Sequence, residues 1–134
     1  MSCNDLKWSY SDAQQKFTTR SNELAQVEAR QSELTWRHSA LTSDLQEKEA
    51  RVDRIETQLW NADGPARATL LMELGVAKAD RDRVLTERAG IDGSLRAVRS
   101  EISRLQQGIA SAQQAKARLQ SEWQSAGCEG RIDW

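Results

Sequence analysis

The chain has 134 residues, a formal net charge of −1, 29% charged residues and a single proline. The near-zero net charge excludes a general electrostatic attraction to nucleic acid or to anionic membranes. With 5% aromatic residues and one proline, sandwiches, barrels and doubly wound sheets are disfavoured, because their turns need frequent glycine and proline. No apolar run approaches the ~20 residues of a membrane span, and the N-terminus lacks a secretory apolar region. We therefore expect a cytoplasmic protein that makes no membrane contact.

The first half of the chain has the periodicity of a coiled-coil helix. Mostly apolar residues recur there at alternating steps of three and four. These seam positions are Tyr10, Ala13, Phe17, Arg20, Leu24, Val27, Gln31, Leu34, His38, Leu41, Leu45, Lys48, Val52, Ile55, Leu59 and Ala62. The pattern predicts a helix over residues 5–62.

The stretch NADGPAR, residues 61–67, interrupts this pattern near the midpoint of the chain. Gly64 can adopt the left-handed conformation that ends a helix, Asp63 can cap the next helix, and Pro65 suits its first turn. We expect a bend over residues 63–66 that turns the chain straight back. The competing fold is one continuous bent helix that dimerises in parallel. It would have to hold Gly64 and Pro65 in its interior, at a cost of about 3 kcal/mol or more.

The same periodicity resumes after the bend and predicts a second helix over residues 67–126, followed by a C-terminal tail over residues 127–134. Its seam positions are Leu70, Leu74, Ala77, Arg81, Val84, Arg88, Ile91, Leu95, Val98, Ile102, Leu105, Ile109, Ala112, Lys116, Leu119, Trp123 and Ala126. The predicted fold is a single all-α domain, a long antiparallel two-helix coiled-coil hairpin.

The charges beside the seam support this pairing. Folding at the bend places Leu45 opposite Val84, Arg51 opposite Asp80 and Glu49 opposite Lys78. Opposite charges on the flanks specify an antiparallel register. Lys48 and Arg81 would share a layer, so we expect their long side chains to extend outward to Asp44 and Asp80.

Catalytic and metal sites are not indicated. The one histidine, His38, falls in the seam opposite Ile91, and no glycine-rich phosphate loop, HExxH or CxxC motif is present. A two-helix hairpin also offers no enclosed pocket for chemistry. We predict no enzymatic activity, no cofactor and no metal.

The two cysteines lie at the open end of the predicted hairpin. In an oxidising compartment Cys3 and Cys128 could close that end as a disulfide. In the cytoplasm, which the sequence favours, we expect two free thiols.

An apolar group beside the bend predicts a partner-binding site. Trp60, Leu71, Met72 and Val76 lie off the seam, as does Leu85 farther along. Exposed tryptophan is uncommon on a free helix and common at interface hot spots. We predict that another protein binds at the bend.

A second predicted surface lies on the outer faces of the two helices. Trp8 and Trp36 take outward positions four heptads apart, and Gly93 lies level with Trp36, with Gly90 one turn away. In a twofold antiparallel homodimer, Trp36 of one chain would lie on the bare backbone at Gly90 and Gly93 of the other, which would make a four-helix bundle. The alternatives are tryptophans lying flat on neighbouring arginines and glycines that only kink the helix.

These patterns indicate a non-enzymatic protein–protein interaction module. In architecture the chain resembles the helical-hairpin stalk proteins of flagellar and type III export ATPases, which implies an adaptor or stalk component of a larger assembly. The alternative is a small inhibitor, such as a phage-encoded antagonist of a host enzyme. Nucleic-acid binding is not predicted, because no basic patch is interleaved with aromatic residues. The preference for arginine over lysine favours a bacterial or phage source.

Overall fold

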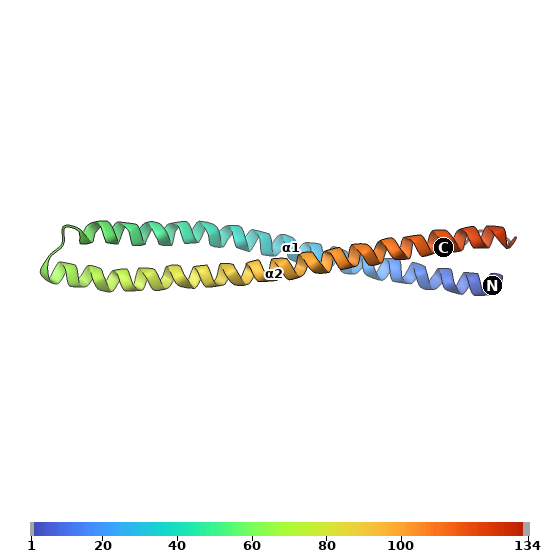
Figure 1. Cartoon of the computed structure of the whole chain (residues 1–134), viewed down its shortest axis with the longest axis horizontal. Helices are drawn as coiled ribbons and strands as arrows, with labels where there is room; N and C mark the ends of the chain where they lie inside the picture. The colour runs from blue at the N-terminus through green and yellow to red at the C-terminus, as the bar shows by residue number, and fades with distance from the viewer. Residues whose placement is uncertain (1, 133–134) are drawn as a thin grey trace. The chain divides into compact units, whose positions relative to one another are not determined.

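The computed structural model describes residues 2–132 and consists of two long helices. Helix α1 spans Cys3–Leu59 and helix α2 spans Gly64–Ser125, and no strand occurs within residues 2–132. The helices run in opposite directions and pack against each other (Figure 1). The predicted all-α antiparallel hairpin is confirmed.

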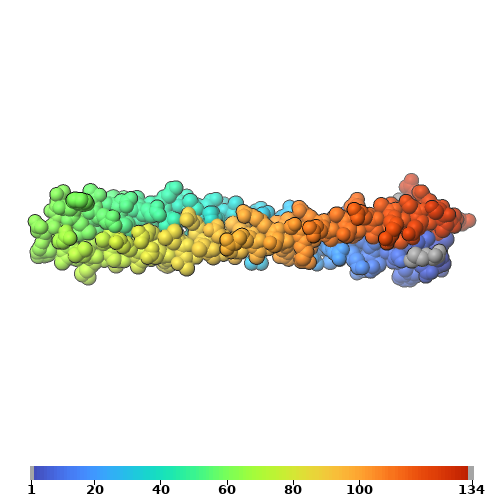
Figure 2. Space-filling model, in the orientation of Figure 1, coloured from blue at the N-terminus to red at the C-terminus, as the bar shows by residue number. Residues whose placement is uncertain are grey.

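The chain divides into two compact units, each built from a segment of α1 and a segment of α2. The bend unit comprises residues 31–97. The end unit comprises residues 1–30 and 98–134. In the bend unit the two helix segments lie against one another along their length, as the space-filling view shows (Figure 2).

The turn between the helices lies three residues earlier than expected. It occupies residues 60–63 instead of 63–66, and α2 already begins at Gly64. Gly64 has a φ of 57°, so its left-handed conformation serves the start of α2 and not the end of α1. Pro65 follows in the first turn, where a missing N–H costs nothing. The Arg67 guanidinium donates a hydrogen bond to the Leu59 carbonyl (3.1 Å) and so satisfies one of the last carbonyls of α1.

The buried residues follow the predicted seam. In the bend unit Val52, Ile55 and Ala77 form a cluster on which Leu70 and Leu74 pack. The remaining buried residues of this unit are Leu34, Leu45, Val84, Ile91 and Leu95. All of these are seam positions, so the pattern alone identified the core of this unit.

Two charged seam residues of the bend unit reach acidic partners. Lys48 pairs with Asp44 (3.6 Å) as expected, whereas Arg81 pairs with its neighbour Asp82 (3.1 Å) and not with Asp80. Asp80 instead pairs with Arg51 (3.6 Å), as the flanking charges predicted.

Two further lysines make contacts that the predicted pairing of the helices does not include. Lys78 lies 3.9 Å from Glu56, so the predicted pairing of Lys78 with Glu49 is wrong. Exposed ion pairs are weak, and flexible lysine side chains choose among nearby carboxylates. Lys116 lies over the Phe17 ring, 4.6 Å from its centroid, where a cation is attracted by the face of the ring.

The end unit has a core that the seam only partly predicted. Leu6, Tyr10, Ala13, Leu119 and Trp123 form its cluster, and Ile132 from the tail joins them. The tail folds back because the Trp123 indole N–H donates to the Gly130 carbonyl (3.0 Å). One isoleucine outside any periodic pattern gives no sequence signal for this contact.

Both helix ends in this unit are capped. At the start of α1, the Ser2 backbone N–H donates to the Asp5 carboxylate (3.3 Å) and the Asp5 backbone N–H donates to the Ser2 hydroxyl (3.1 Å), which is a capping box. The Ser2 hydroxyl also donates to the same carboxylate (2.8 Å). The hydrogen bonds from Ser2 lower the pKa of the Asp5 carboxyl. At the end of α2, the Cys128 N–H donates to the Trp123 carbonyl and the Gly127 N–H to the Gln124 carbonyl, with Gly127 at a φ of 71°. This is a Schellman motif.

Cys3 and Cys128 form a disulfide, with their Cα atoms 5.9 Å apart. The expectation of two free thiols is therefore wrong. The Schellman turn brings Cys128 back beside the first turn of α1, so the two cysteines meet although 125 positions separate them in the sequence. The bond ties the tail to the N-terminus of α1, next to the cluster that Ile132 covers.

Two leucines of the bend unit differ in burial, so replacing each with alanine should lower the free energy of unfolding by different amounts. Leu45 is 5% exposed in the seam and Leu85 is 37% exposed beside it. Leu45→Ala should lower the free energy of unfolding by about 2–5 kcal/mol, because it leaves a cavity between the helices. Leu85→Ala should cost roughly 0.5 kcal/mol or less. Urea unfolding followed by circular dichroism measures the free energy of unfolding of both variants. Equal losses would contradict the assignment of Leu45, but not Leu85, to the seam.

The disulfide should contribute to stability through the unfolded chain. Replacing Cys3 and Cys128 with serine should lower the free energy of unfolding by about 3 kcal/mol, because the open chain gains conformational freedom. Adding a reductant to the unmodified protein should produce the same loss in urea unfolding and should leave the serine variant unchanged. If the reductant does not change the urea midpoint of the unmodified protein, the disulfide does not contribute to its stability.

Candidate interaction surfaces

The first candidate site is an apolar surface beside the bend. We call Trp60, Leu71, Met72 and Val76 the tip surface. Trp60 is 88% exposed and Met72 76% exposed, and Leu71 and Val76 are also exposed. Trp60 lies on the turn just after α1, where its backbone N–H donates to the Thr57 carbonyl (3.3 Å). The structure thus places the four predicted residues in one unit with their apolar side chains open to solvent.

Local helix geometry explains why these side chains are exposed. Leu70 and Leu74 pack toward α1 against Val52 and Ile55. Leu71 and Met72 follow Leu70 directly, and each residue of a helix turns about 100° from the one before it. Helix α2 is therefore apolar both on the side that faces α1 and on a side that α1 does not cover. An apolar side of a helix is usually buried against another element.

The outer face near Trp36 is the second candidate site. Trp36 is 72% exposed and lines a shallow groove of about 440 Å³ together with Gln31, Ser32, Thr35 and Ser39. Helix α2 runs without interruption through Gly90 and Gly93. A Cβ atom at Gly90 would meet nothing within 4 Å, and at Gly93 it would meet only the end of the Arg96 side chain at 4.0 Å. Packing within the chain therefore does not require either glycine.

Trp8 belongs to the end unit, where it is 76% exposed. Like Trp36, it extends from α1 away from the seam, as its outward position in the sequence predicted. A shared face with Trp36, and self-association through Trp36, Gly90 and Gly93, stay predictions.

His38 is fixed by a carboxylate. Its Nε2 atom lies 2.8 Å from the Asp92 Oδ1 atom, and both side chains are partly exposed. The seam predicted that His38 lies opposite Ile91, and the imidazole reaches Asp92, the next residue along α2. Within residues 2–132, no three His, Cys, Asp or Glu side chains gather in a way that could hold a metal ion.

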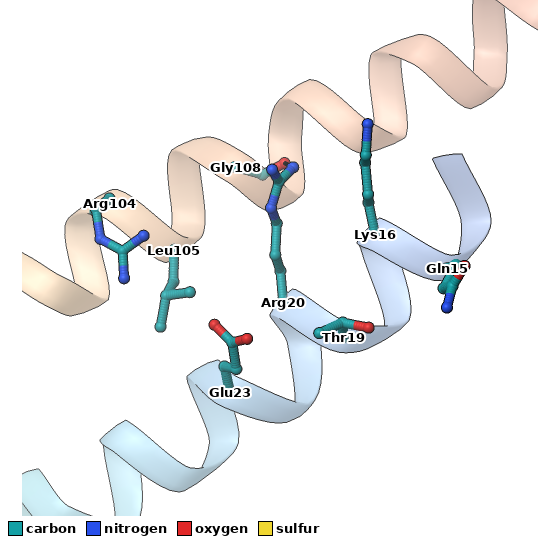
Figure 3. A pocket seen from close by; sticks show the side chains of 8 residues that line it. All are labelled: Gln15, Lys16, Thr19, Arg20, Glu23, Arg104, Leu105 and Gly108. Carbon is teal, nitrogen blue, oxygen red and sulfur yellow. Dashed lines mark hydrogen bonds between the residues drawn. The ribbon is translucent and has the colours of Figure 1, made fainter. Parts of the chain in front are cut away.

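A groove of about 520 Å³ lies in the end unit between the two helix segments. Its main feature is Arg20, whose guanidinium crosses from α1 and donates to the Gly108 carbonyl (3.1 Å) on α2 (Figure 3). A Cβ atom at Gly108 would lie 3.0 Å from the Arg20 side chain, so the glycine makes room for this crossing.

The other cations of this groove already have acidic partners. Lys16 pairs with Asp12 (3.0 Å), and Arg104 pairs with Glu101 (3.8 Å). Because Arg20 is also engaged, the groove offers no set of unpaired cations for an anionic ligand. We regard it as part of the helix packing.

One residue beside the tip surface was not predicted from the sequence. Gly75 lies between Met72 and Val76 on the outer side of α2, and a Cβ atom there would meet nothing within 4 Å. Its spacing of three and four residues from Met72 and Leu71 was the available signal.

Neither helix in the described residues is both long and apolar enough to cross a membrane. Comparison with protein-family models, curated proteins and solved structures finds no match to this chain.

Proposed function

We propose that the chain is a non-enzymatic interaction module, an adaptor or stalk component of a larger assembly, that binds another protein through its tip surface. The observation that carries this proposal is the exposure of Trp60 and Met72 beside the bend. Neither side chain belongs to the seam that holds the two helices together.

The chemistry of the tip surface supports a protein partner. Its exposed apolar side chains come from the turn, at Trp60, and from the first four turns of α2, at Leu71, Met72 and Val76. Burying such groups against a partner releases their hydration water, and tryptophan and methionine are enriched at interface cores. A tryptophan at the end of a hairpin can also enter a pocket that a flat surface could not fill.

The alternative function is that of a small inhibitor, which would use the same tip surface to block a groove on an enzyme. The position of Trp60 on the turn favours this reading as well, because a protruding aromatic side chain suits a groove. The two functions differ in their outcome, since an inhibitor lowers the activity of the captured enzyme and an adaptor does not.

Self-association through the outer face is a separate part of the proposal. Trp36 and the open backbone at Gly90 and Gly93 support a contact in which the indole of one chain lies on the glycines of another. Glycine destabilises a helix interior by about 1 kcal/mol relative to alanine, and a close approach by a second chain would offset that cost.

The cytoplasmic location expected from the sequence stays a prediction. The bond between Cys3 and Cys128 favours a compartment in which thiols are oxidised, because cytoplasmic thiols are kept reduced.

Tip variants test partner binding. Replacing Trp60 and Met72 with serine should abolish capture of the partner from an extract of the source cells, measured by affinity purification and mass spectrometry. Thermal unfolding should stay nearly unchanged, because neither residue is buried. Trp8→Ser, at an exposed tryptophan of the end unit, is the control and should keep capture. Full capture by the double variant would place the binding surface elsewhere.

Trp36 tests the proposed self-association. Trp36→Ala or Gly93→Glu should lower the average mass measured by sedimentation equilibrium, because each removes the contact at Trp36, while circular dichroism shows unchanged helicity. The first variant removes the aromatic contact, and the second places a charge where the indole would lie. An unmodified chain that sediments at the 15.1 kDa of one copy at tens of micromolar would contradict this contact.

A further inference from the structure

Helix α2 carries a second apolar stripe near the bend, on the side away from α1. We call it the α2 stripe. Its members are exposed and uncharged, and they recur at steps of three and one, the spacing of a helix-packing face. They are Ala68, Leu71, Met72, Gly75, Val76 and Ala79. On the same stretch of helix, Leu70, Leu74 and Ala77 make the face that packs on α1.

The α2 stripe contains both large and small side chains. Leu71, Met72 and Val76 project from it, and Gly75 leaves open space between them. Glycine destabilises a helix interior relative to alanine, and nothing within the chain requires it at position 75. A surface of projections and gaps is what one helix presents to another.

We propose that the α2 stripe binds the same stripe of a second copy of this chain, with the two α2 helices antiparallel. In one register every member of the stripe meets a suitable residue. Met72 lies opposite Gly75 of the second copy, Leu71 opposite Val76, and Ala68 opposite Ala79. The largest side chain thus meets the residue that has none, and the twofold axis repeats each pair.

The ends of the stripe are also complementary in charge. In the same register Asp82 lies level with Pro65 of the second copy, in the first turn of α2. That turn contains no acidic residue of its own, and its unpaired N–H groups favour a negative charge. Arg83 lies level with Gly64 of the second copy, next to Asp63. The stripe itself is uncharged, so the contact buries no unpaired ion.

A second copy suits this surface because a twofold contact requires a surface that is complementary to itself. The inference rests on the proposed function and divides the tip surface. The α2 stripe takes a second copy, and Trp60, which lies on the turn outside the stripe, stays available to another protein. The contact covers about three helical turns, less than a standard interface of ~1,200–2,000 Å². We therefore expect a dissociation constant in the micromolar range.

The test introduces opposite charges at positions that face each other in the proposed contact. It uses the full chain carrying Trp36→Ala, which removes the other proposed contact. Sedimentation equilibrium from about 1 to 500 µM should show dimers of this parent. Leu71→Lys and Val76→Glu should each raise the dissociation constant at least tenfold, because each puts two unpaired charges into the contact. An equimolar mixture of the two variants should recover dimers, since the lysine introduced into one chain then faces the glutamate introduced into the other.

Leu85→Lys is the matched control. Leu85 is an exposed leucine of α2 outside the stripe, and this variant should dimerise like the parent. A parent that stays monomeric at about 500 µM, a mixture no better than its separate variants, or equal loss in the control would overturn the inference. Capture of another protein, lost on replacing Trp60, would still support the proposed function in any of these cases.

Discussion

The two long helices of this protein stay folded because they bury one apolar seam between them. Helices of 57 and 62 residues with many charged side chains gain little from helix propensity alone, because most helical stability in proteins comes from packing. Residues such as Leu45, Val84 and Leu105 supply that packing. The bend keeps both halves of the seam in one chain, so the helices meet without the entropy loss of association.

Packing of only two helices has a consequence for function. Each helix covers one side of its neighbour and leaves the other sides to solvent, so an apolar residue outside the seam has nothing in the chain to pack on. Trp36, Trp60 and Met72 are exposed for this reason. Larger domains bury such residues in a shared core, whereas a hairpin can bury them only against another molecule. Its outer faces therefore carry apolar side chains that packing within the chain leaves exposed.

The end unit shows how such a fold closes its open end. Helix termini fray where few contacts hold them, and here three different devices act within a few residues. The capping box at Ser2 and Asp5 satisfies the start of α1, the Schellman turn at Gly127 ends α2, and the bond between Cys3 and Cys128 joins the two. Ile132 then covers the cluster that contains Trp123. The tail is thus part of the packed structure up to residue 132.

Local sequence patterns predicted the two helices, the approximate position of the bend and nearly all of the buried residues. They could do so because helical periodicity and the conformational limits of Gly64 and Pro65 are local properties. The sequence also predicted that Trp60, Leu71, Met72 and Val76 are exposed, because no other element of a two-helix fold can cover residues outside the seam. Three contacts could not be predicted in this way: the ion pair of Lys78 with Glu56, the bond between Cys3 and Cys128, and the packing of Ile132 on the cluster that contains Trp123. The ion pair depends on which rotamer a flexible side chain adopts, and the other two contacts depend on the path of the chain beyond the helix ends, where no repeating pattern constrains it.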